Sequence, residues 1–302
     1  MAVKVTDDMG RDLLLGRPPK RIVSLVPSET YTVAALGAGD RLVGRTDYCV
    51  LPAEVSCLPS VGGTKDVDPE KVCALEPDLV LANQEENARG PLEALAALRV
   101  PVFVSFPRRV AEGFSHMARL ARMLGLADDA RVKQLMATAY RSLRRSEDVA
   151  REQDRMPRVF VPIWDQPLMT FNDDTFAHDL LLQAGLRNVF ADRERAYPLA
   201  ADLGRRSPVA ADRLGDRDRR YPRVTEAEVI ERAPDLVLLP DEPYRFGIGD
   251  VERFSAQGTP ASRAGQVRLV DGKDLFWPGA RAVEALEHLR AMVATLAAAP
   301  VS

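Results

Sequence analysis

The pentapeptide Pro-Asp-Leu-Val-Leu occurs twice in this chain of 302 residues, at 77–81 and at 234–238. Each copy follows an acid-rich segment with the apolar spacing of a short helix, and each leads into an acidic loop. A second pair of similar segments precedes the two copies. Residues 21–25 and 158–161 each predict a buried strand followed by a helix that ends near a glycine. Repeats this far apart indicate a duplicated domain. The alternative is that the pentapeptide is merely a common way to enter a buried strand.

The stretch Asp128–Asp154 lies between the two halves of this repeat and predicts one long helix. Its apolar residues recur three or four positions apart, two aspartates at its start suit a helix cap, and no glycine or proline occurs before Pro157. About 25 helical residues span roughly 37 Å. We therefore predict an N-terminal α/β lobe at 1–126, a connecting backbone helix at 127–156 and a C-terminal α/β lobe at 157–302.

Strand and helix patterns alternate on both sides of this helix, which is typical of parallel sheets covered by helices. The predicted fold class is therefore α/β, with two Rossmann-like lobes, each built on a parallel sheet, joined by one long backbone helix and separated by a cleft. In open α/β sheets, ligands bind beyond the carboxyl ends of the strands. The segment 192–223 breaks the pattern, because it is dense in Arg and Asp and poor in large apolar side chains. We predict that it is an exposed insertion.

Composition excludes several classes of function. The net charge of −3 provides no basic footprint for nucleic acid, and no apolar run approaches the roughly 20 residues of a membrane span. The N-terminal stretch carries acids early and lacks a long apolar segment, so it predicts no signal peptide. We expect a cytoplasmic location if residue 1 is the true start, and an extracytoplasmic one if this form lacks an export segment. We also expect a monomer.

Residue patterns for catalysis or metal binding are weak. The sequence has no GxSxG, P-loop or GxGxxG motif. His116, His178 and His288 all fall in predicted helices, far from the strand ends, so a three-histidine metal site is not expected. The three cysteines have no CxxC spacing, and we expect buried or idle thiols. The prediction is a binding protein without catalytic residues, metal site or intrinsic cofactor.

Candidate ligand-binding residues follow the predicted strands. Ser28 is expected to cap the helix after the first strand, where backbone N–H groups face the strand end. Both tryptophans and several other aromatics lie on loops, which suits stacking on a large, flat or amphipathic ligand. The alternative is that they close the edge of each lobe's core. The candidates in the first lobe are Ser28, Glu29, Arg45, Tyr48, Gly63, Thr64, Asn83, Glu85 and Arg108, and those in the second are Trp164, Met169, Phe171, Tyr244, Phe246 and Trp277.

The motifs RIVSLVPSET, VGGTKDVDPEKVCALEPDLVLA and DTFAHDLLLQAGLRNVF, with the long helix between them, resemble the class III substrate-binding proteins. These serve ABC importers for cobalamin, ferric siderophores and haem, and have a helical backbone between two lobes. The resemblance covers roughly residues 3–296 and is nearest to the cobalamin-binding branch. It implies capture of a metal chelate, a corrinoid such as cobalamin above all, in the cleft between the lobes, for delivery to a permease.

The same resemblance implies roles for single residues. Tyr48 matches a cleft tyrosine of the cobalamin branch, Tyr221 a cleft tryptophan, and Trp164 another aromatic, whereas Asn83 stands where that branch has a tryptophan. The family docks to its permease through one surface glutamate in each lobe. The implied residues are Glu86, which lies near an aligned position held by Arg89, and Glu226 or Glu228.

Other functions remain open at this point. The ligand could be a ferric siderophore or haem, or the protein could be a cytosolic binder of a metallo-cofactor that has no permease. An enzyme is a third class, because nitrogenase-like metalloproteins have a similar two-lobed architecture. That class would need cysteine ligands, and only Cys49 follows a predicted strand closely.

Overall fold

The computed structural model of this chain describes residues 3–152 and 156–297. The chain folds into two compact units. Unit 1 holds the residues up to Arg141 together with Trp277–Val283, and unit 2 holds Ser142–Phe276 together with the residues from Glu284 onward. A short segment late in the sequence therefore returns to the first unit.

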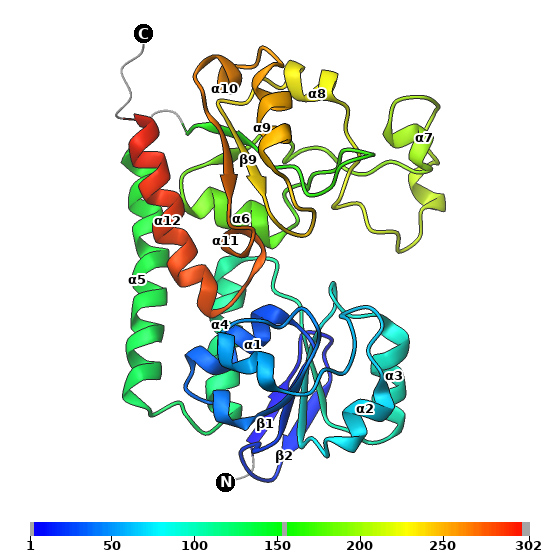
Figure 1. Cartoon of the computed structure of the whole chain (residues 1–302), viewed down its shortest axis with the longest axis vertical. Helices are drawn as coiled ribbons and strands as arrows, with labels where there is room; N and C mark the ends of the chain where they lie inside the picture. The colour runs from blue at the N-terminus through cyan, green and yellow to red at the C-terminus, as the bar shows by residue number, and fades with distance from the viewer. Residues whose placement is uncertain (1–2, 153–155, 298–302) are drawn as a thin grey trace. The chain divides into compact units, whose positions relative to one another are not determined.

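Unit 1 is built on a parallel sheet with the strand order β4-β3-β5-β6. A hairpin precedes this sheet, and α2 and α3 lie side by side (Figure 1). The strands are β1 (Val3–Thr6) and β2 (Asp12–Leu15) in the antiparallel hairpin, then β3 (Ile22–Ser24), β4 (Leu42–Arg45), β5 (Leu79–Asn83) and β6 (Val102–Ser105). The helices are α1 (Pro27–Ala35), η1 (Gly39–Arg41), η2 (Ala53–Cys57), α2 (Pro69–Ala74), α3 (Arg89–Ala97) and α4 (Val110–Met123).

Unit 2 is built on a second parallel sheet, with the strand order β10-β9-β7-β8. Its strands are β7 (Arg158–Phe160), β8 (Arg187–Asn188), β9 (Leu236–Pro240) and β10 (Val267–Val270). Its helices are α6 (Phe176–Gln183), α7 (Leu199–Asp202), η3 (Ala211–Arg213), α8 (Glu226–Glu231), α9 (Ile248–Ser255), α10 (Pro260–Arg263) and α11 (Lys273–Phe276). The α/β fold with one parallel sheet in each half is confirmed.

The two sheets have the same topology. Written from the other edge, the second order is β8-β7-β9-β10, so β7 corresponds to β3, β8 to β4, β9 to β5 and β10 to β6. All five residues of β5 and all five of β9 are buried, as expected for strands covered on both faces. The duplication predicted from the repeated pentapeptide is therefore present in the order of the strands.

The aspartate of the repeated pentapeptide has the same structural role in both units. The Asp78 carboxylate accepts a hydrogen bond of 2.9 Å from the N–H of Arg21, and the Asp235 carboxylate accepts one of 3.0 Å from the N–H of Arg158. In each unit this bond joins the start of one central strand to the start of the next. The aspartate thus fixes the register of two neighbouring parallel strands, which explains why it is repeated together with the apolar residues of the pentapeptide.

The long helix predicted between the halves is α5 (Ala130–Glu152). Asp129 caps it, because its carboxylate accepts a hydrogen bond of 2.8 Å from the N–H of Arg131. The end predicted at 153–154 lies outside the described residues. The closing helix is α12 (Ala280–Ala297), and its Arg290 is bonded to α5 within unit 2, donating at 2.7 Å to both the carbonyl and the hydroxyl of Ser142.

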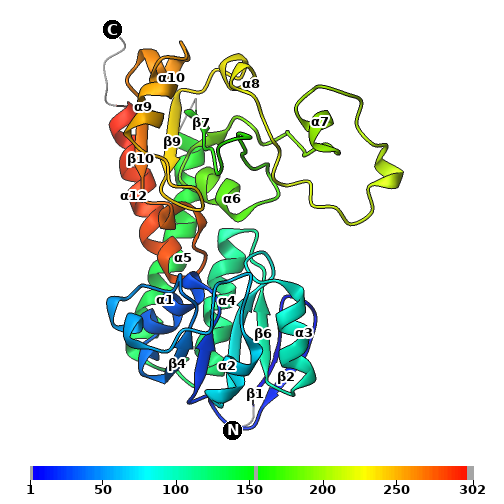
Figure 2. The same ribbon diagram turned by 45° about the vertical axis from the view of Figure 1, so that its right-hand side comes forward.

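The segment 192–223, which carries α7, extends from the rest of unit 2 in Figure 2. It is folded around one buried carboxylate, that of Asp202, which is 2% exposed. This carboxylate accepts hydrogen bonds from Arg193 Nη1 at 3.1 Å and from the N–H groups of Ala196 and Arg223 at 2.8 Å each. Ala201 and Leu214 are also buried. The expectation of an exposed insertion is therefore wrong at Ala201, Asp202 and Leu214, where the segment is folded around a buried ion pair.

Candidate functional site

The candidate residues of unit 1 lie at the carboxyl ends of β3, β4, β5 and β6, because each follows one of these strands. Parallel strands bring these ends to one edge of the sheet. Ser28 is buried in the first turn of α1, but Val26 is the N-cap residue. The expectation that Ser28 caps this helix is therefore wrong: α1 begins at Pro27, which fits the first helical position, so the cap falls one residue earlier.

Glu29 lies in a buried polar cluster of this edge and is 4% exposed. Its carboxylate accepts a hydrogen bond of 2.6 Å from Ser105 Oγ, and its two oxygens lie 2.7 and 2.9 Å from His116 Nε2. The prediction that all three histidines lie far from the strand ends is wrong for His116, because α4 brings it against α1. The Glu29 carboxylate is thus bonded to partners within unit 1, and little of its surface is accessible to a ligand.

The loop after β4 presents Tyr48, which is 64% exposed. A Cβ atom on Gly63 would lie 3.4 Å from Tyr48 Cε2, so the Tyr48 ring lies close to the backbone of Gly63. Arg45 supports the loop, since it donates at 2.9 Å to the carbonyl of Thr46 and at 3.0 Å to that of Ser56. Tyr48 is therefore the most exposed of the aromatic candidates.

Asn83, at the end of β5, shapes the next loop. Its side-chain oxygen accepts a hydrogen bond of 2.8 Å from the N–H of Glu85, and its N–H donates at 2.9 Å to Asn87 Oδ1. Asn87 donates in turn at 2.9 Å to the carbonyl of Thr64. Asn83 is 6% exposed, so the residue that stands in place of a tryptophan holds two loops together. Glu85 and Thr64 are half-buried beside it.

Arg108 lines a pocket of about 520 Å³ beyond the end of β6. Its guanidinium carbon lies 5.5 Å from the centre of the Phe106 ring. On the same pocket, Asp8 accepts hydrogen bonds from Arg119 at 2.6 Å and from the N–H of Phe106 at 2.7 Å. Arg108 is exposed and is the cation of the candidate set nearest this hollow.

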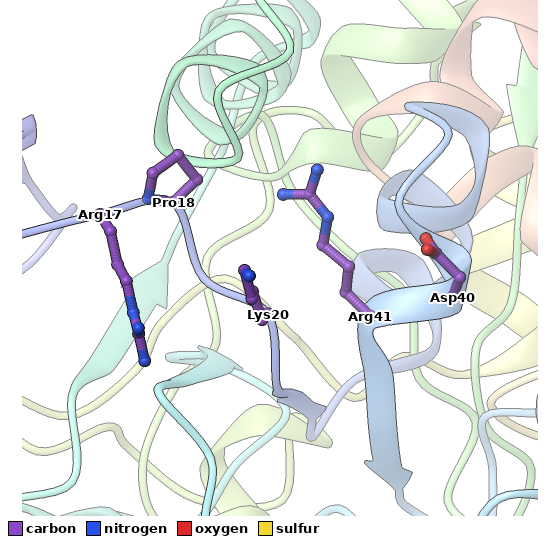
Figure 3. Close-up of a pocket in the computed structure, with 5 residues that line it drawn as sticks. All are labelled: Arg17, Pro18, Lys20, Asp40 and Arg41. Carbon is purple, nitrogen blue, oxygen red and sulfur yellow. The ribbon is translucent and has the colours of Figure 1, made fainter. Parts of the chain in front are cut away.

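A second pocket lies at the opposite edge of the unit 1 sheet. It has a volume of about 390 Å³ and is lined by Arg17, Pro18, Lys20, Asp40 and Arg41 (Figure 3). Lys20 and Arg41 come just before β3 and β4, so the pocket is at the amino ends of the strands. Arg41 donates at 2.7 Å to the carbonyl of Leu124, which gives it a structural role. None of the candidate ligand residues lines this pocket.

In unit 2 two candidate residues, Trp164 and Met169, form a row with Arg223 across a short antiparallel ribbon. Trp164 is the bridge partner of Met169, and Met169 is the bridge partner of Arg223. Directly opposite residues of antiparallel strands point to the same face, so these three side chains share one face of the ribbon. Trp164 is 45% exposed. Its ring lies edge-on to Tyr244 at a centroid distance of 5.6 Å, so the face continues onto a second aromatic.

The other aromatic candidates of the second half are more deeply buried. Phe246 is 3% exposed, Phe171 is 1% exposed and packs against Phe276, and Trp277 is 7% exposed. Trp277 belongs to unit 1, where it meets Tyr31 edge-on at 6.0 Å. These three match the alternative that loop aromatics close the edge of a core. Tyr221 is half-buried, two residues before Arg223.

The glutamates implied in permease docking are both at the surface. Glu86 is exposed in the loop after β5, and Glu226 is exposed at the first position of α8. Arg253 lies 3.8 Å from the Glu226 carboxylate and is also bonded to Asp165 and Asp250. Over the described residues, no helix has the length and apolarity that a membrane crossing needs. No group of three or more His, Cys, Asp or Glu that could hold a metal ion occurs within 3–152 and 156–297.

Comparisons with known proteins bear on what this arrangement does. A vitamin B12-binding protein of Yersinia pestis (strain Pestoides F) is 32% identical over 180 residues, which cover 59% of this chain and 63% of that protein. A vitamin B12-binding protein of Yersinia pseudotuberculosis (serotype IB, strain PB1/+) gives the same values. The chain thus spans 63% of the length of the curated relatives that it matches.

Solved structures show the same fold. The periplasmic heme-binding protein RhuT from Roseiflexus sp. RS-1 has a TM-score of 0.72 at 22% identity, over 92% of this chain and 99% of that one. The periplasmic vitamin B12 binding protein BtuF of Vibrio cholerae has a TM-score of 0.72 at 20% identity, over 92% and 98%. Residues 22–239, well over half of the sequence, match the family model described as periplasmic binding protein. The chain therefore belongs to the periplasmic binding protein family.

Proposed function

We propose that this protein captures a corrinoid, cobalamin above all, outside the cytoplasm and delivers it to an ABC importer without catalysing a reaction. The observation that carries the proposal is the 32% identity over 180 residues to vitamin B12-binding proteins. The exposed aromatics support it, because Tyr48 in unit 1 and Trp164 in unit 2 are both exposed, and each ring offers contact area to a large amphipathic ligand. The half-buried Tyr244 and Tyr221 would extend the face of unit 2.

Tryptophan fluorescence tests the ligand directly. The protein has two tryptophans, and only Trp164 is substantially exposed. We expect cyanocobalamin to quench the emission saturably at micromolar concentration or below, while a ferric siderophore and haemin have no specific effect. Free N-acetyltryptophanamide in the same titration corrects for light absorbed by the coloured ligands. Saturation by haemin or a siderophore instead would refute the corrinoid.

Two variants assign the signal to a side chain. Trp164→Phe should remove most of the quenching, whereas Trp277→Phe should leave it, because Trp277 is buried against Tyr31. Trp164→Ala should weaken binding by about 1 to 3 kcal/mol, as for a large aromatic anchor at the centre of an interface. An unchanged Kd in Trp164→Ala would show that this ring does not contact the ligand.

Heme is the second candidate ligand. The observation in its favour is that solved structures of similar fold include heme-binding proteins, such as RhuT and one from Pseudomonas aeruginosa. The same titration separates the two ligands. A haemin-saturable signal that requires Trp164, with cyanocobalamin inert, would replace the corrinoid by heme and retain the role in uptake.

Delivery to a permease is proposed through the surface glutamates Glu86 and Glu226. The double variant Glu86→Lys/Glu226→Lys reverses both charges at exposed positions. It should bind cyanocobalamin with an unchanged Kd and fail to support corrinoid uptake in cells that depend on this protein. A double variant with Glu70→Lys and Glu252→Lys, both also at exposed positions, is the control. Equal uptake by both double variants would place the docking surface elsewhere, or show that no permease is involved.

A further inference from the structure

The segment 192–223 contains arginines of two kinds. Four arginines in or near it are paired with carboxylates: Arg193 with Asp202 and Glu228, Arg219 with Glu194, Arg220 with Asp218, and Arg232 with Asp192. Within the part of the chain that the structure describes, the other six arginines of the segment form no ion pair: Arg205, Arg206 and Arg213, which are exposed, and Arg195, Arg217 and Arg223. Asp202, Glu194 and Asp218 are bonded to other arginines, so Arg195, Arg217 and Arg223 have no ion-pair partner of their own.

These three cations are gathered in one place. The guanidinium carbon of Arg195 lies 4.4 Å from the centre of the Tyr197 ring, and that of Arg217 lies 5.3 Å from the same centre. The Tyr197 hydroxyl donates at 2.6 Å to the carbonyl of Asp218, which fixes the ring. Burial, and then the nearby charge of Arg195, lowers the pKa of the Arg223 guanidinium. Geometry places Arg223 near Arg195, because the N–H groups of Arg223 and of Ala196, the neighbour of Arg195, both donate to the Asp202 carboxylate at 2.8 Å. Arg223 is half-buried.

The cluster adjoins the aromatic face of unit 2. Arg223 shares its ribbon face with Met169 and Trp164 through the two bridges described above. Its backbone N–H is held by the Asp202 carboxylate at 2.8 Å, so the position of Arg223 is set by the buried anchor of the segment. A flat ligand on Trp164 would therefore have Arg223 at one end of the row.

We propose that Arg195, Arg217 and Arg223, arranged around Tyr197, bind an oxyanion, a phosphate or carboxylate group carried by the ligand of this protein. The proposal rests on the proposed function, because it places that ligand on the aromatic face of unit 2. Guanidinium groups suit these oxyanions, since their planar N–H donors match two oxygens at once. A bound oxyanion would also remove the repulsion between Arg195 and Arg223. A corrinoid with a nucleotide loop offers a phosphodiester, and heme offers propionate carboxylates.

A first experiment needs no organic ligand. Thermal unfolding is followed in sodium phosphate and in sodium chloride at the same low ionic strength. Phosphate should raise the Tm of the unsubstituted protein by about 3 °C more than chloride does, as expected when an anion fills most of one site. The variant Arg195→Gln/Arg223→Gln should lose this difference. The control Arg205→Gln/Arg206→Gln removes two exposed arginines of the same segment and should retain it.

A second experiment identifies the group that the site takes. Cyanocobalamin is compared with dicyanocobinamide, which lacks the nucleotide loop and its phosphodiester, and haemin is compared with its dimethyl ester. Arg195→Gln/Arg223→Gln should weaken binding of the member that carries the oxyanion by about tenfold and that of its partner by less than twofold. Equal losses for both members would overturn the proposal, because the arginines would then not recognise the anionic group.

The two experiments separate the two proposals. If neither corrinoids nor haemin bind the unsubstituted protein, the proposed function fails, and the phosphate shift alone decides whether the anion site exists. If phosphate and chloride act alike on the unsubstituted protein and on Arg195→Gln/Arg223→Gln, there is no oxyanion site, even where corrinoid binding is confirmed.

Discussion

Replacing Asp202 by alanine should open the segment 192–223 locally. The Asp202 carboxylate is fully buried and accepts three hydrogen bonds, from Arg193 Nη1, Ala196 N and Arg223 N. Removing one partner of a buried ion pair costs about 3 to 5 kcal/mol. In this variant the Arg193 guanidinium would still be paired with Glu228 at 3.0 Å. We therefore expect a cost at the lower end of the 3 to 5 kcal/mol range. A loss of about 3 kcal/mol corresponds to a rise of roughly 150-fold in the local opening constant.

Amide hydrogen exchange measures this opening. The informative amides are not the two that Asp202 binds but others that depend on the folded segment. The N–H of Arg195 donates to Arg219 O at 2.8 Å, and that of Val209 donates to Tyr197 O at 2.8 Å. Both should exchange about 100-fold faster in Asp202→Ala, while amides in β9 should change little because the core of unit 2 is separate from the segment.

The matched control is Asp212→Ala, which removes an exposed aspartate from the same segment. It should exchange within about threefold of the unsubstituted protein, as is usual for surface substitutions. If Asp202→Ala behaved like this control, the buried carboxylate would not organise the segment and the reasoning would be refuted. A loss of protection throughout unit 2 would also contradict it, since the segment would then be part of one cooperative core.

Three further substitutions and one labelling experiment test other parts of the structure. Gly62→Ala should lower the free energy of unfolding by about 2 kcal/mol in urea titrations, because its φ is +107° and a Cβ would lie 2.7 Å from the carbonyl oxygen of Asp66; an unchanged midpoint would contradict this. Glu29→Ala should cost about 2 to 4 kcal/mol, since it leaves buried hydrogen-bond partners unsatisfied, and an unaltered urea midpoint would show that the cluster contributes little. A thiol reagent at pH 8 should label Cys57, which is exposed, much faster than Cys49, which is buried. Burial raises the pKa of the Cys49 thiol, so the folded protein keeps the thiol proton to a higher pH than the unfolded chain does. The free energy of unfolding should therefore fall as the pH rises above about 8.5, and Cys49→Ala should reduce that fall.

Much of the fold could be predicted from the sequence because the repeated pentapeptide marks strands that hold corresponding places in the two sheets, β5 and β9. Asp78 and Asp235 are polar residues next to buried strands, and their recurrence reflects the same bond to the start of a neighbouring strand. The short helices α7, α10 and α11 were not predicted. Each has four residues, so it has no hydrophobic period to read and depends on caps and tertiary contacts.

The candidate site could be predicted only in part. Tyr48 and Trp164 follow strands and are exposed, as the pattern indicates. The position of Glu29 after β3 gave no sign of His116, which is 87 residues away in sequence and occupies its carboxylate. Neither Arg195 nor Arg223 was predicted, because nothing in a sequence shows which arginines are left without an acid once the others are paired. The unusual density of arginine in 192–223 was the available signal.

The return of Trp277–Val283 to unit 1 limits how this protein can be divided. The chain passes from one unit to the other at three places, after Arg141, after Phe276 and after Val283, and the first and last of these fall inside α5 and α12. A chimaera that joins relatives at a single point after Arg141 would therefore take Tyr31 from one parent and its partner Trp277 from the other. Exchanging a whole unit between family members requires three crossovers, so the halves of this duplicated protein are no longer interchangeable modules.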